Sequence, residues 1–133
     1  MSSPLIAGFE DCTLPPGEFH HEQHVQVVWC YLREMPLATA AARFIGHLKR
    51  YASTAGKPGL YHETITWALL ILTDERMRQA PDADWDEFRR ANRDLLTWKP
   101  SILDRYYRPE TLRSDRARAV FVFPDAAMYE ALR

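Results

Sequence analysis

Residues 60–79 read LYHETITWALLILTDERMRQ, and this segment sets the architecture expected for the whole chain. At about 100° per residue, one arc of a helix collects His62, Ile65, Thr66, Leu69, Leu72, Thr73 and Arg76. The part from Trp67 to Leu72 is apolar on more than one side. The segment therefore predicts a central helix with neighbours on two faces.

Two more helical patterns precede this segment. The first runs from about Glu22 to Met35, ends at Pro36, and carries one narrow stripe of His21, His24, Val28, Tyr31, Leu32 and Met35. The second runs from Leu37 to Ala55 and is rich in alanine, with Gly56 as its C-cap. Lys57-Pro58-Gly59 is a tight connection into residues 60–79, so we expect these two helices to be antiparallel neighbours.

Shorter helical signals follow. Asp84 is placed as the N-cap of a fourth helix, because Glu87 stands three residues later in a capping-box arrangement. Residues 100–107 and 109–113 each begin with proline, which suits the first turn of a short helix. No pair of alternating segments predicts a sheet. The sequence thus predicts an all-α bundle of four principal helices with short C-terminal helical turns.

Size and composition fit one domain spanning residues 1–133. The chain has 133 residues, 47% hydrophobic and 26% charged, which is typical of a globular domain with its own core. Residues 1–17 contain Pro4, Pro15 and Pro16 and are expected to form an extended N-terminal lead-in.

Charge and hydropathy exclude several classes of partner. The net charge is −1 and the basic residues of the second half alternate with acidic ones, so binding to nucleic acid is not expected. The longest apolar run, Trp67 to Leu72, is too short to span a bilayer, and no signal peptide is recognisable, so we expect no membrane association and a cytoplasmic location. Neither Cys12 nor Cys30 belongs to a C-x-x-C pair, and the oligomeric state is left open.

The histidines are the main indication of chemistry. His21 and His24 are three residues apart on one helix, and His62 begins the stripe of another. Together they could hold a divalent ion such as zinc, nickel or iron, as in a metal-dependent enzyme or a metal-binding protein. Glu63 could then act as a general base or orient a ligand. The H-E-x-x-H motif of zinc proteases is not present.

The alternative is a helical domain that binds a small molecule or a partner without a metal. In that interpretation the histidines and Tyr61 hydrogen-bond a polar ligand beside Trp29 and Trp67. Histidines near helix starts are also common as purely structural, hydrogen-bonded residues.

The motifs resemble those of a family of small bacterial helical proteins that has no established activity. The resemblance rests on F19-x-H21-x-x-H24, on Y61-H62-E63-T64-I65-T66, its most specific part, and on F123-P124-D125, and it covers most of the chain. It implies a common site made of His21, His24, His62, Glu63 and Thr66. His20, His47 and Cys30 lie outside the pattern.

Overall fold

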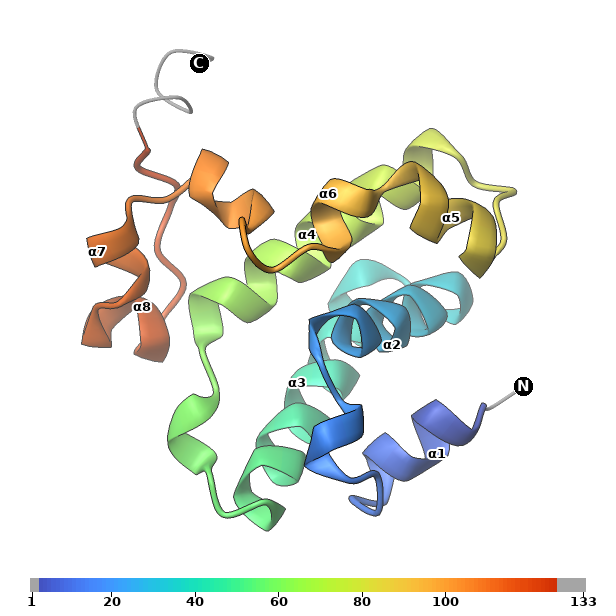
Figure 1. The fold of residues 1–133 in the computed structure, drawn as a ribbon, viewed down its shortest axis with the longest axis horizontal. Coiled ribbons are helices and arrows are strands. Elements are labelled where there is room, and N and C mark those ends of the chain that lie inside the picture. The colour runs from blue at the N-terminus through green and yellow to red at the C-terminus, as the bar shows by residue number, and fades with distance from the viewer. Residues whose placement is uncertain (1–2, 127–133) are drawn as a thin grey trace.

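Helices form all the regular structure between residues 3 and 126, the part of the chain that this computed structural model describes (Figure 1). The α-helices are α1 (Pro4–Glu10), α2 (His21–Glu34), α3 (Leu37–Thr54), α4 (Glu63–Gln79), α5 (Trp85–Ala91), α6 (Arg93–Leu96), α7 (Pro109–Leu112) and α8 (Asp115–Ala119). Three 3₁₀ turns join them: η1 (Pro16–Glu18), η2 (Pro58–Leu60) and η3 (Ile102–Arg105). The predicted all-α class and bundle of helices are confirmed.

Local signals place the principal helices where the sequence predicts them. At the start of α4, Nδ1 of His62 accepts a hydrogen bond from the N–H of Ile65 at 3.1 Å. At the start of α5, the Asp84 carboxylate accepts from the N–H of Glu87 at 2.8 Å, and the Glu87 carboxylate accepts from the N–H of Asp84 at 3.0 Å. These caps satisfy N–H groups that the first turn of a helix leaves free.

The N-terminal segment differs from the expected extended lead-in, because Pro4–Glu10 is helical. The hydroxyl of Ser3 caps this helix by accepting from the N–H of Ile6 at 3.2 Å, and Pro4 stands in the first turn, where a missing N–H costs nothing. Ile6 and Phe9 are buried and give α1 an apolar side. The sequence predicts that Pro4 interrupts regular structure, whereas in the structure it begins a helix. Met1 and Ser2 lie outside the described residues.

Among residues 3–126 the core has two hydrophobic clusters, and both α2 and α4 contribute to each of them. The first cluster joins α1, α2 and α3 and includes Phe9, Phe19, Val28, Tyr31, Phe44 and Leu70. The second joins α2 and α4 to α5, α6 and η3 and includes Val25, Trp29, Leu69, Phe88, Leu95 and Leu103. The central position predicted for α4 is therefore confirmed. The single stripe predicted for α2 is incomplete, because Val25 and Trp29 are also buried on another side of it.

The connection through η2 sets α3 and α4 against each other. The two helices are in contact and run in opposite senses on either side of η2 (Figure 1). Both also contact α2, so the three long helices meet around one space. That space contains the candidate site.

The C-terminal helices pack beside the first half of α4 (Figure 1). The Thr64 hydroxyl donates to the carbonyl of Val120 at 2.8 Å and accepts from the N–H of Val122 at 3.1 Å. The Arg118 guanidinium donates to the carbonyl of Gly59 at 2.8 Å. These bonds fix the start of α4, where His62 lies. Within residues 3–126, no helix combines the length and the apolar character needed to cross a membrane.

Candidate ligand pocket

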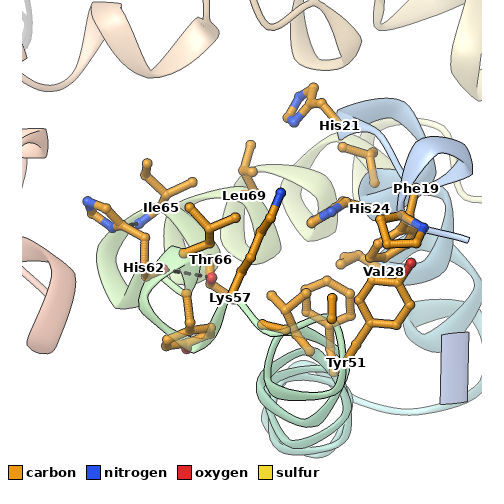
Figure 2. A pocket seen from close by; sticks show the side chains of 18 of the residues that line it. Phe19, His21, His24, Val28, Tyr51, Lys57, His62, Ile65, Thr66 and Leu69 are labelled. Carbon is orange, nitrogen blue, oxygen red and sulfur yellow. Dashed lines mark hydrogen bonds between the residues drawn. The ribbon is translucent and has the colours of Figure 1, made fainter. Parts of the chain in front are cut away.

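A pocket of about 460 Å³ lies between α2, α3 and α4 (Figure 2). Its lining is formed by Pro16, Phe19, His21, His24, Val25, Val28, Phe44, Leu48, Tyr51, Ala52, Ala55, Lys57, Leu60, Tyr61, His62, Ile65, Thr66, Leu69 and Trp98. Most of these side chains are apolar or aromatic. A pocket of this size and character is typical of sites for small organic molecules.

His21, His24 and His62 all line this pocket, so the tertiary structure does bring them to one place. Their three-residue spacing puts His21 and His24 on the same side of α2, and the η2 connection brings the start of α4 opposite (Figure 2). The three imidazoles have different hydrogen-bond partners, and those partners decide what each one can do.

The ring of His62 is fully engaged with the protein. Nδ1 accepts from the N–H of Ile65 at 3.1 Å, so the proton of the neutral ring is on Nε2, which donates to the carbonyl of Leu112 at 2.6 Å. Burial, together with the nearby charge of Arg118, lowers the pKa of His62 and keeps the ring neutral. His62 is therefore a structural cap that joins α4 to α7.

The ring of His21 is engaged on one side only. Its Nε2 lies 2.9 Å from the carbonyl of Leu95, to which it donates, and its ring packs 4.9 Å from that of Trp98. Burial lowers the pKa of His21, so the ring is neutral near pH 7. In this tautomer Nδ1 carries a lone pair.

His24 has no hydrogen-bond partner for its ring among the described residues. Its imidazole stacks on Phe19 with the ring centres 4.1 Å apart. Burial, with smaller contributions from His21 and His20, lowers the pKa of His24 to about 4. Every fully buried side-chain nitrogen or oxygen in residues 3–126 has a partner, so the ring nitrogens of His24 stay accessible, and the pocket is the space that they face.

The metal site predicted from the three histidines is not assembled. Within residues 3–126, no three side chains of His, Cys, Asp or Glu are placed to hold a metal ion. A metal needs a ring nitrogen with a free lone pair, and His62 uses its lone pair to cap α4. His21, His24 and His62 line the same pocket, but in this arrangement they do not form a set of three metal ligands.

Glu63, predicted as a general base, is not part of the pocket lining. Its carboxylate accepts hydrogen bonds from the hydroxyl of Tyr61 and from Nε1 of Trp67, the latter at 3.2 Å. Burial and the Glu63 carboxylate raise the pKa of Tyr61. The carboxylate thus organises the start of α4 and does not point a base into the pocket.

Of the four residues predicted to bind a ligand, two line the pocket and two do not. Tyr61 and Thr66 line the pocket, although the Thr66 hydroxyl is already committed to the carbonyl of His62 at 2.7 Å. Trp29 and Trp67 do not line it. Trp29 belongs to the second cluster, and its ring centre lies 5.5 Å from that of Trp85. This is because its side of α2 faces α5.

Several lining residues, among them Trp98 and Lys57, were not assigned to the predicted site from the sequence. From the sequence, Trp98 could either cover the pocket or form a dimer contact; in the structure it lines the pocket from the segment after α6, and its ring packs against that of His21. Lys57 comes from the connection into η2 and, among the described residues that line the pocket, is the one with a formally charged side chain. A lysine in the short connection that leads into Tyr61 and His62 is the sequence signal that indicates this charge at the site.

Comparison with protein-family models, with curated proteins and with solved structures gives no match for this chain. The resemblance to the bacterial family therefore stays a prediction, and the assignment of function depends on the pocket alone.

Proposed function

We propose that this protein binds a small organic molecule in the pocket between α2, α3 and α4. The observation that carries the proposal is the His24 ring, which faces an apolar pocket of about 460 Å³ without a hydrogen-bond partner among the described residues. Because the ring nitrogens of His24 are accessible from the pocket and have no protein partner, they are free to form a hydrogen bond with a polar group of a ligand. The apolar lining would supply most of the binding free energy.

Most of the other lining polar groups are already satisfied by the protein, which supports this interpretation; the exceptions are the ammonium of Lys57 and Nδ1 of His21. The Tyr51 hydroxyl donates to the carbonyl of Leu14 at 2.6 Å, and the Tyr61 and Thr66 hydroxyls are bonded as described above. His62 has both nitrogens in use. The lining therefore presents apolar surface with only a few polar groups free to orient a ligand.

The test uses a neutral apolar fluorophore, N-phenyl-1-naphthylamine, so that no charge preference is built into the probe. We expect saturable binding to the wild-type protein. Ala52→Phe should abolish binding because Ala52 lines the pocket and a phenyl ring would fill it. Ala42→Phe, an equally large change at an exposed position of the same helix, should leave binding unchanged.

Two results would contradict the proposal. One is a wild-type protein that does not bind the probe. The other is an Ala52→Phe variant that keeps its circular dichroism spectrum and binds the probe as tightly as the wild type does, since the probe would then bind elsewhere.

A further inference from the structure

The polar groups of the pocket lining that have no protein partner are of one type: they carry positive charge or are neutral imidazoles. Within the described residues, three such groups in the lining have no hydrogen-bond or ion-pair partner: the ammonium of Lys57, the ring nitrogens of His24, and Nδ1 of His21. None of the described residues that line the pocket is Asp or Glu. The free groups are therefore one full positive charge and two neutral imidazoles, with no negative charge to balance them.

The side chain of Lys57 is directed to this pocket. Its backbone N–H donates to the carbonyl of Ala52 at 2.8 Å, which holds the residue against the end of α3. In the view of Figure 2, the side chain extends from the α3–α4 connection towards the side of the pocket that carries His21 and His24. Lys57 is exposed as a residue, so its ammonium group keeps contact with solvent while its stem lines the pocket.

From this placement we infer that the ligand is an amphipathic carboxylate, with an apolar body enclosed by the pocket and an anionic head at the Lys57 end. A carboxylate accepts hydrogen bonds only, so it suits the ammonium of Lys57 and an N–H of the His24 imidazole. A cationic head would face Lys57 without a compensating carboxylate. A neutral head would leave the ammonium to solvent alone.

The inference rests on the proposed function and is tested with three ligands that share one chain. Decanoate, decan-1-ol and decylammonium displace the neutral fluorophore in competition experiments at neutral pH and low salt. We expect decanoate to bind roughly fivefold more tightly than decan-1-ol, the size of a well-placed exposed ion pair, and decylammonium to bind more weakly than the alcohol. Added salt should weaken the binding of decanoate and leave the binding of decan-1-ol unchanged.

Variants assign the preference to Lys57. Lys57→Met should remove the advantage of decanoate over decan-1-ol, and Lys57→Arg should keep most of it. Arg116→Met is the matched control, because this substitution also removes one positive charge. Arg116 is exposed on α8 and lies outside the pocket lining.

The outcomes separate the two proposals. Equal binding of all three ligands, or a decanoate preference that persists in Lys57→Met, would overturn the carboxylate inference and leave the apolar pocket in place. Failure of every ligand and of the fluorophore to bind would overturn both.

Discussion

The Nε2–H of His62 donates a hydrogen bond to the backbone carbonyl of Leu112 at 2.6 Å, and this bond ties the start of α4 to α7, fifty residues further along the chain. Because Nδ1 of the same ring caps α4, one imidazole serves two structural purposes. His62 therefore serves the stability of the fold, whereas the ring of His24, which lines the same pocket, stays available to a ligand.

The first prediction concerns this double role. His62→Ala removes the cap of α4, worth about 1 kcal/mol, and leaves the carbonyl of Leu112 without its donor, at a further cost of about 1–3 kcal/mol. We expect chemical denaturation to show the sum of both losses. His62→Asn keeps a capping side chain and should recover about 1 kcal/mol of the free energy of unfolding. An alanine variant as stable as the wild type would show that neither bond contributes.

The second prediction is a loss of stability in mild acid. The pKa of His24 is lowered by burial from 6.5 to about 4, so below about pH 6.5 the unfolded chain takes up a proton that the folded chain refuses. Stability should therefore be fully present above pH 6.5 and fall as the pH drops towards 4, by up to about 3 kcal/mol for His24 alone. The pKa values of His21 and His62 are also lowered by burial and act in the same direction.

The contribution of His24 is isolated by His24→Phe, which keeps an aromatic ring against Phe19 and cannot be protonated. We expect this variant to be at least as stable as the wild type at neutral pH and to lose less stability between pH 6.5 and 4. Urea denaturation across this range measures the difference. Identical pH profiles for the two proteins would show that His24 is not buried as a neutral ring.

The third prediction concerns metal ions. Since His62 has no free lone pair in the folded protein, His62→Asn should leave the zinc-binding isotherm of the protein unchanged when it is purified without a histidine tag. Isothermal titration calorimetry with zinc, nickel and iron(II) would measure this. Loss of one equivalent of bound metal in His62→Asn would instead restore the three-histidine site, with His62 giving up both of its hydrogen bonds.

The fourth prediction tests the central position of α4 with two adjacent residues. Leu70 is fully buried in the first cluster, so Leu70→Ala should lower the free energy of unfolding by about 2–5 kcal/mol. Ile71 is 41% exposed, and Ile71→Ala should cost roughly 0.5 kcal/mol or a little more. Similar losses for both, measured by urea denaturation, would contradict the packing of α4 described above.

Local chemistry along the chain was sufficient to predict much of the fold. Helical periodicity, the Asp84–Glu87 capping box and Pro36 depend on residues within one or two turns of each other, so the sequence alone determined the all-α class, the approximate limits of α2, α3 and α4, and the start of α5. The same local argument failed at Pro4, because a proline that breaks a helix and one that begins a helix are told apart only by the cap before it and the core beneath it.

The roles of the histidines were decided only by the tertiary structure. The sequence determined that His21 and His24 share a helix face, but their partners come from distant segments: Leu95 for His21 and Leu112 for His62. Which ring nitrogen keeps a free lone pair depends on these bonds, and no spacing rule contains them. The same holds for Trp98 and Lys57, because a side chain lines a pocket only when packing brings separate helices around the same space.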